Sequence, residues 1–162
     1  MWPRTIDGLS NERANVRPRL ILPAGVAAEI VSLARGETPK EACGILVGRT
    51  GSGVTEVTDH APGRNVHRRP ADRFELAPED LLAAEREARA KGLEVVGFWH
   101  SHPSSGAEPS AVDRAASWNG YSYLIVSLAE ESGARLRSWR LWEENFVEED
   151  VLEPPIAEGM RP

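Results

Sequence analysis

The chain has 162 residues, of which 41% are hydrophobic and 27% are charged, as in one globular domain, and it is too short for two independent domains. Its formal charge of −6 argues against nucleic acid as a partner, because phosphate backbones are bound by clustered Lys and Arg. No apolar run approaches the roughly 20 residues of a membrane helix. Residues 1–7 lack a basic region followed by an apolar stretch, so we expect no secretory signal. We therefore expect a cytoplasmic protein without a membrane partner.

The two ends of the chain differ from its middle in composition. Residues 1–17 are polar and carry no sustained period, and the end of the chain is acidic and contains prolines. We therefore expect an N-terminal tail over 1–17, one domain over 18–150 and a C-terminal tail over 151–162. The acidic segment 143–150 fits either a last strand or a contact with a carrier protein.

The first predicted element is a helix over residues 23–35. Pro23 suits its first turn, three apolar residues follow at helical spacing, and Gly36 is expected to end it. Two β-rich segments come next, at 42–47 and 54–59, and the Gly51-Ser52-Gly53 sequence between them predicts a hairpin.

A second amphipathic helix is predicted to begin at Pro78 and to end at Gly92, with a charged outer face. Three further strands are expected at 93–100, 121–128 and 134–142, and a hairpin at 130–133 joins the last two. This order of elements predicts a two-layer or three-layer α/β fold with a mixed sheet, much of it antiparallel.

The end of the strand 93–100 carries the most informative residues. Alternate side chains of a strand share one face, so His100 and His102 can meet one metal ion. Pro103 ends the strand, and Ser110 is a natural N-cap that places Asp113 in the first turn of a following helix. Two histidines and one carboxylate leave a fourth position for water, which is the pattern of a catalytic zinc site.

A water molecule activated by zinc needs a general base to take its proton. Glu41 is the candidate, because it opens an apolar strand and would lie at the mouth of a cleft. Ser110 could donate a hydrogen bond to the oxyanion that develops on the substrate.

Glu41, His100-x-His102 and Ser110-x-x-Asp113 together resemble the JAMM (MPN-plus) metallopeptidases without a departure in spacing. The resemblance covers residues 19–150 and includes the segment Glu-x-Cys-Gly-Ile-Leu-x-Gly. It implies one zinc ion per chain held by His100, His102 and Asp113. It also implies Glu41 as the base, Ser110 as the residue that stabilises the tetrahedral intermediate, and a curled, mostly antiparallel sheet flanked by helices, similar to that of cytidine deaminases.

The compact chain most resembles the stand-alone prokaryotic members of that family. Some of these release cysteine or another amine from the C-terminus of a ubiquitin-like sulfur-carrier protein, so the resemblance implies such a protein, or its conjugate, as substrate. Asn65 and the segment near Arg73 and Phe74 lie where such enzymes would guide an extended tail. The sequence leaves the leaving group and the oligomeric state open.

Several other interpretations compete with this one. A non-catalytic MPN-type binding module would be expected to lack at least one of the five site residues, a zinc deaminase needs more cysteines, and a non-heme iron oxygenase would have no use for Glu41 or Ser110. Cys43 lies inside an apolar strand, where it is expected to pack as a small hydrophobic residue. Core packing is also expected for the tryptophans, Trp2, Trp99, Trp118, Trp139 and Trp142.

Overall fold

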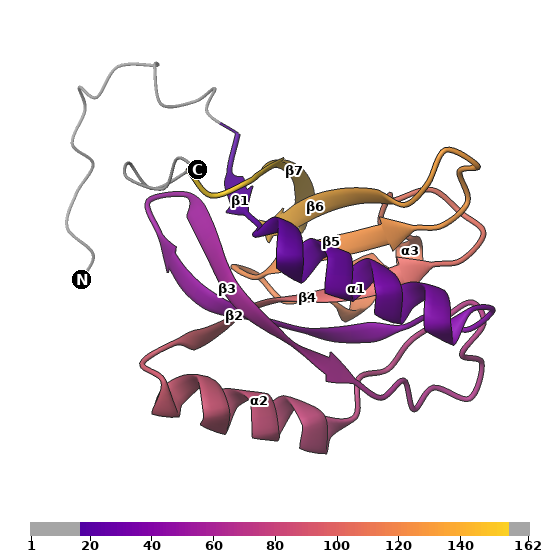
Figure 1. The fold of residues 1–162 in the computed structure, drawn as a ribbon, viewed down its shortest axis with the longest axis horizontal. Helices are drawn as coiled ribbons and strands as arrows, with labels where there is room; N and C mark the ends of the chain where they lie inside the picture. The colour runs from indigo at the N-terminus through magenta and orange to yellow at the C-terminus, as the bar shows by residue number, and fades with distance from the viewer. Residues whose placement is uncertain (1–16, 156–162) are drawn as a thin grey trace, which may run out of the picture.

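The computed structural model describes residues 17–155, which form a curled seven-stranded sheet with three helices. Figure 1 shows how they are arranged. In chain order the elements are β1 (Arg19–Ile21), α1 (Ala24–Glu37), β2 (Cys43–Gly51), β3 (Val54–Gly63), α2 (Pro78–Ala90), β4 (Glu94–His102), α3 (Ala111–Ala116), β5 (Ser122–Ser127), β6 (Arg135–Trp142) and β7 (Asn145–Leu152). The strands follow the order β1-β3-β2-β4-β5-β6-β7, and the sheet closes into a barrel where β7 meets β1.

The sheet is mixed, as the sequence predicts. Its antiparallel pairs are β2–β3, β2–β4, β5–β6 and β6–β7. The pairs β4–β5, β1–β3 and β1–β7 are parallel. The expected α/β domain with a mixed, mostly antiparallel sheet flanked by helices is therefore confirmed.

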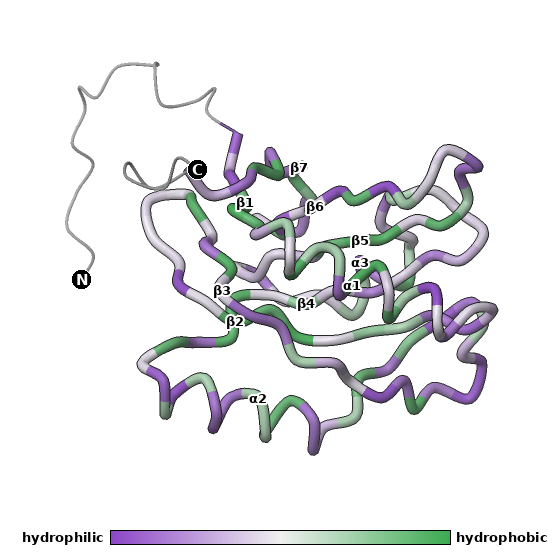
Figure 2. The backbone as a smooth tube through the Cα atoms, viewed as in Figure 1, coloured by the Kyte–Doolittle hydropathy of each residue, from purple (hydrophilic) through white to green (hydrophobic). Residues whose placement is uncertain are grey.

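Two hydrophobic cores cover the two faces of the sheet. In one core, Ile30 and Ala34 of α1 pack with Leu46 and Trp99. In the other, Ala84 and Ala88 of α2 pack with a second set of strand residues, Ile45, Val47, Phe98 and Tyr123. Figure 2 shows the coils of α2 alternating between hydrophobic and hydrophilic colours, as expected for a helix with one buried face. Successive side chains of β2 point alternately toward α1 and α2. Because both faces of the strand are covered, nearly all of its buried residues are apolar.

The helix ends differ from the expectation at one point. Gly36 does not end α1, which continues to Glu37; Pro39, which has no backbone N–H group to continue the helix, follows the C-cap residue Thr38. The second helix ends as predicted, with Gly92 in the left-handed region at a φ of 67°. The amide of Leu93 donates to the carbonyl of Ala88, which completes a Schellman motif.

The sequence did not predict β1 and left β7 open. The acidic segment 143–150 is now seen to contribute to a last strand, which continues to Leu152, two residues beyond the expected end of the domain. Residues 1–16 and 156–162, which include most of the two expected tails and Trp2, lie outside the described residues.

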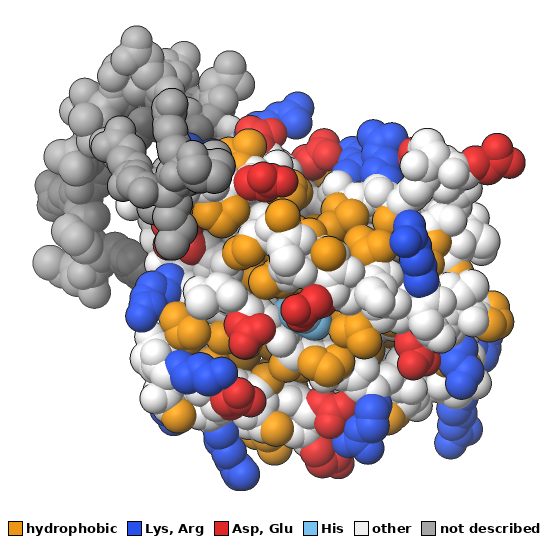
Figure 3. All heavy atoms as spheres, viewed as in Figure 1, with side chains coloured by type: hydrophobic (Ala, Val, Ile, Leu, Met, Phe, Trp, Pro, Cys, Tyr) orange, Lys and Arg blue, Asp and Glu red, His pale blue; other side chains and the backbone are white. Residues whose placement is uncertain are grey.

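No helix among residues 17–155 is long and apolar enough to cross a membrane. On the face drawn in Figure 3, Lys and Arg side chains lie among Asp and Glu side chains and form no continuous basic patch. The absence of a nucleic-acid partner stays a prediction. The mixture of basic and acidic side chains on this face is consistent with that prediction.

Candidate metal centre

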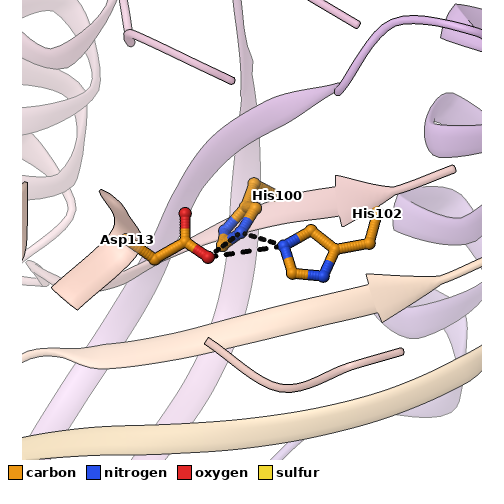
Figure 4. A group of neighbouring side chains, drawn as sticks. All are labelled: His100, His102 and Asp113. Atoms are coloured by element: carbon orange, nitrogen blue, oxygen red, sulfur yellow. Dashed lines mark hydrogen bonds and ion pairs between the residues drawn. The ribbon is translucent and has the colours of Figure 1, made fainter. Parts of the chain in front are cut away.

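Three side chains from two elements converge on one point. His100 and His102 project from the end of β4 and Asp113 from the first turn of α3, and Figure 4 shows their nitrogen and oxygen atoms turned toward one another. The two imidazole Nε2 atoms are 3.0 Å apart. Oδ2 of Asp113 lies 3.3 Å from Nε2 of His100 and 3.4 Å from Nε2 of His102. The predicted convergence of the histidines on one face is therefore present.

These distances fit a tetrahedral metal ion. Donor atoms at ~2.1 Å from a tetrahedral zinc lie ~3.4 Å from one another, close to the three separations found here. Among residues 17–155, this is the one group of three His, Cys, Asp or Glu side chains placed to hold a metal. Two neutral nitrogens and one carboxylate oxygen are also a donor set that zinc accepts.

A hydrogen bond selects the ring nitrogen that His102 offers. Its Nδ1 lies 2.6 Å from the carbonyl oxygen of Gly106, and because a carbonyl can only accept, Nδ1 carries the proton. Nε2 then keeps its lone pair for a metal. The loop after β4 thus fixes the tautomer that the site needs.

The short helix α3 holds Asp113 in place. The hydroxyl of Ser110 accepts a hydrogen bond from the amide of Asp113, and Oδ2 of Asp113 accepts one from the amide of Ser110 at 2.7 Å, which is a reciprocal capping box. Ser110 is the N-cap and Asp113 the third helical residue, as the sequence predicts. The same oxygen therefore caps the helix and faces the histidines.

Burial and mutual contact shift the pKa values of the three groups. Burial lowers the pKa of His100, which is only 2% exposed. Burial also acts to lower the pKa of His102, but its hydrogen bonds with Asp113 and Gly106 outweigh burial and leave that pKa raised. Burial tends to raise the pKa of Asp113, and its contacts with the two imidazole rings, together with the amide of Ser110, overcome this and hold that pKa well below its usual range. The Asp113 carboxylate is thus charged at neutral pH, as a metal ligand must be.

Glu41 lies two residues before the start of β2 and is only 7% exposed. Burial raises its pKa to about 7, with His102 acting in the opposite direction and Asp113 adding to the rise. A carboxylate with a pKa near neutrality can both accept and return a proton. The structure therefore brings Glu41 into electrostatic reach of two of the candidate ligands, His102 and Asp113, although each of them lies more than 60 residues further along the chain.

Cys43 has no catalytic setting. Its side chain is buried inside β2, and burial raises the pKa of its thiol to about 12. A thiol of this kind is protonated at neutral pH and does not act as a nucleophile.

The two predicted substrate-binding residues occupy different surroundings. Phe74 stacks on the ring of His100. It also lines an apolar groove of about 350 Å³ whose other walls include Leu81, Phe98 and Trp118. Asn65 uses its side-chain amide for hydrogen bonds to backbone groups of its own chain. Contact of either residue with substrate stays a prediction.

The expected core packing of Trp118 is wrong. Its side chain is 58% exposed at the groove, against the edge of Phe98 at 5.8 Å between ring centroids. Trp142 is also exposed. Trp118 follows the short helix α3 instead of lying in a strand, and that position was the available signal that it belongs to the rim of the site.

The chain is similar in sequence to a known protein family and to several characterised proteins. The family described as prokaryotic homologs of the JAB domain matches residues 23–142. A desampylase of Haloferax volcanii is 43% identical over 114 residues, which cover 67% of this chain and 81% of that protein. A CysO-cysteine peptidase of Mycobacterium tuberculosis is 32% identical over 133 residues, which cover 82% of this chain and 89% of that protein.

A solved structure agrees in fold. The solution structure of a protein from Desulfitobacterium hafniense superimposes with a TM-score of 0.77 at 32% sequence identity. The match covers 86% of this chain and 95% of that one. The curled sheet and its flanking helices are therefore shared with an experimentally determined structure.

Proposed function

The chain belongs to the prokaryotic JAB-domain family, and from this membership we propose that it is a zinc-dependent peptidase. Its proposed substrate is the peptide or isopeptide bond at the C-terminus of a ubiquitin-like protein of the sulfur-carrier type. The observation that carries the proposal is the cluster of His100, His102 and Asp113 beside the buried carboxyl group of Glu41. The names of the two relatives, a desampylase and a CysO-cysteine peptidase, support the substrate class.

Each polar group of the site has a role in this proposal. His100, His102 and Asp113 would hold one zinc ion, which when bound polarises the substrate carbonyl and lowers the pKa of a water molecule toward neutrality. Glu41 takes a proton from the water and returns it to the leaving amine, a task for which a pKa of about 7 is suited.

Ser110 has the proposed role of stabilising the negative charge that develops on the carbonyl oxygen. Its Oγ atom accepts the amide hydrogen of Asp113 as part of the helix cap, so the hydroxyl hydrogen stays available for donation. One hydroxyl group can therefore serve the helix and the substrate together.

The groove beside Phe74 supports the proposed path of the carrier's C-terminal tail. Its apolar lining includes Phe74, whose ring stacks on His100, and the exposed Trp118. An extended tail lying there would bring its last carbonyl group to the candidate metal centre.

The test uses the purified protein loaded with zinc, and a ubiquitin-like sulfur-carrier protein with cysteine joined to its C-terminal carboxyl group. We expect about one zinc per chain, release of cysteine by the wild type, and loss of about 10² to 10⁴ in kcat for Glu41→Gln with zinc retained. Glu85→Gln makes the same change on the exposed face of α2 and should cleave normally.

Other outcomes point elsewhere. A protein that binds no zinc after reconstitution would show that the ligand assignment is wrong and would favour a non-catalytic binding module. A protein that binds zinc but leaves the adduct intact would put the substrate in doubt and keep the metal site.

A further inference from the structure

We propose that Asn65 and Ser101 are positioning residues that fix the backbone beside Glu41 and so aim its carboxyl group at the metal centre. The inference rests on the proposed function of Glu41 as general base. Two separate parts of the chain, the loop with Asn65 and Pro70 and the strand with Ser101, hold the backbone of residues 41 and 42 through four hydrogen bonds. The side chains of Asn65 and Ser101 each make one of these bonds.

Glu41 needs such partners because of where it lies. It is buried, but it precedes the first residue of β2, so no regular strand partner serves its backbone. A buried backbone N–H or C=O group without a partner is strongly unfavourable. Here the amide of Glu41 donates to the carbonyl of Pro70 at 2.6 Å, and its carbonyl accepts from Nδ2 of Asn65 at 2.9 Å.

The side chain of Asn65 joins the base to the loop that covers the site. Its Nδ2 atom donates to the carbonyls of Glu41 and Arg73, each at 2.9 Å. Its Oδ1 atom accepts from the amides of His67 and Glu75 at 3.0 and 3.1 Å. The Nδ2 group of Asn65 therefore holds the backbone of Glu41, while its Oδ1 atom binds two amides of the loop that carries Phe74.

Ser101 ties the same segment to the strand of the metal ligands. The antiparallel ladder of β2 and β4 begins with the pair Cys43 and His100, and one residue beyond it Ala42 is hydrogen-bonded to Ser101. The amide of Ser101 donates to the carbonyl of Ala42 at 2.9 Å, but the return bond, from the amide of Ala42, goes to the hydroxyl of Ser101 at 2.8 Å. A side chain thus provides the acceptor that a backbone carbonyl gives in a regular ladder.

The position of Ser101 between the two histidines means that its contact with Ala42 links the segment of Glu41 to the candidate metal ligands. Ser101 is fully buried and stands between the two candidate metal ligands in the sequence His100-Ser101-His102. The residue next to the base is therefore bonded to the residue between the ligands. A general base works only within hydrogen-bond reach of the proton it takes, so a small displacement of Glu41 would slow the reaction.

Two variants test the arrangement. Asn65→Asp keeps the shape and the acceptor half of the side chain but removes its donation to the carbonyls of Glu41 and Arg73. Ser101→Ala removes the acceptor for the amide of Ala42. Asp80→Ala is the matched control, because Asp80 accepts from the amide of Arg64, the neighbour of Asn65, at 2.8 Å and does not contact Glu41. The probe is the carrier protein with C-terminally joined cysteine, and the enzyme is the zinc-loaded full chain.

We expect kcat to fall about tenfold or more in both variants, with KM changed less than about twofold, zinc stoichiometry unchanged and the control like the wild type. We also expect the amide hydrogen of Glu41 to exchange with solvent about tenfold faster in both variants, as measured by NMR. This second readout does not depend on activity.

The remaining outcomes overturn the proposal. A raised KM with an unchanged kcat for Asn65→Asp would show that Asn65 contacts the substrate. Loss of zinc in both variants would show that the two residues support the metal ligands on β4 and not Glu41. Equal loss of activity in Asp80→Ala would mark general ordering of the loop. If the wild type binds zinc but does not cleave the probe, the proposed substrate fails separately, and unchanged exchange at Glu41 in the variants would then overturn the positioning role.

Discussion

Phe74 lies flat against the imidazole ring of His100, with the ring centroids 4.4 Å apart and the planes inclined by 23°. The phenyl ring covers one side of a candidate metal ligand and keeps it from solvent. A group that orients a ligand in this way can influence metal binding as well as the substrate.

We expect Phe74→Ala to weaken zinc binding by about tenfold, because the ring of His100 becomes free to turn and is exposed to water. Competition with a chelator of known zinc affinity measures the effect. Leu81→Ala is the control, since Leu81 lines the same groove without stacking on His100. An unchanged zinc affinity with a raised KM would limit Phe74 to the groove wall.

Removing the charge of Glu41 is expected to stabilise the zinc-free protein at alkaline pH. Burial raises the pKa of Glu41 from 4.5 to about 7, so between these values the folded protein binds more protons than the unfolded chain. This contribution to stability is present below pH 4.5 and is lost as the pH rises through 7. The glutamine variant has no such group to ionise. As the pH rises from 4.5 to 8, the unfolding free energy of Glu41→Gln should therefore increase by about 2 to 3 kcal/mol relative to that of the wild type.

Urea unfolding of both proteins after removal of zinc measures that difference. The corresponding change at the exposed Glu85 should give the same pH dependence as the wild type. A constant difference between Glu41→Gln and the wild type across this range would show that Glu41 titrates normally when folded.

The two roles of Ser110 can be separated by substitution. Ser110→Ala should lose about 1 kcal/mol of unfolding free energy with the helix cap, and about 10² to 10³ in kcat with the oxyanion donor. Ser110→Asp can still cap α3 but has no hydroxyl hydrogen to donate, so it should regain stability and not activity. Thermal unfolding and steady-state kinetics of the two variants measure these effects. Recovery of kcat in the aspartate variant would show that Ser110 only caps α3 and does not donate to the oxyanion.

A buried ion pair secures the closure of the barrel. The carboxylate of Glu149 on β7 accepts hydrogen bonds from Arg140 at 3.0 Å, Ser122 at 3.0 Å and Ser138 at 2.6 Å. Glu149→Ala would leave the guanidinium group of Arg140 with no charged partner, so we expect a loss of about 3 to 5 kcal/mol in urea unfolding.

The paired replacement Arg140→Met with Glu149→Leu should recover much of that loss, because it removes both buried charges. Glu87→Ala, which breaks the exposed pair with Lys91, should cost no more than about 0.5 kcal/mol. A loss at Glu149 as small as this control would show that the buried pair contributes little.

Local patterns predicted much of this molecule because they depend on near neighbours in the chain. The hairpin at 51–53 is present, with Ser52 and Gly53 both at positive φ, as a tight two-residue turn requires. The convergence of His100 and His102 follows from the two-residue period of a strand, and the position of Asp113 follows from the cap at Ser110.

The features that the sequence did not predict depend on distant contacts. Strand β1 has three residues and exists because it pairs with β3 on one side and β7 on the other. Glu149 is buried inside an acidic segment only because Arg140 neutralises it. The hydroxyl of Ser101 meets the amide of Ala42 across 59 residues of chain, and no local pattern contains that information.

The parallel pairing of β1 with β7 also sets how the domain responds to force. Arg19 lies opposite Asp150 and Ile21 opposite Leu152, so the two strands run in the same direction. Tension applied between residues 17 and 155 would slide one strand along the other and load their hydrogen bonds together instead of opening them one after another. The pairing of β1 with β3 shares that load. The domain should therefore resist being pulled apart from these two points more strongly than if β7 ran antiparallel to β1.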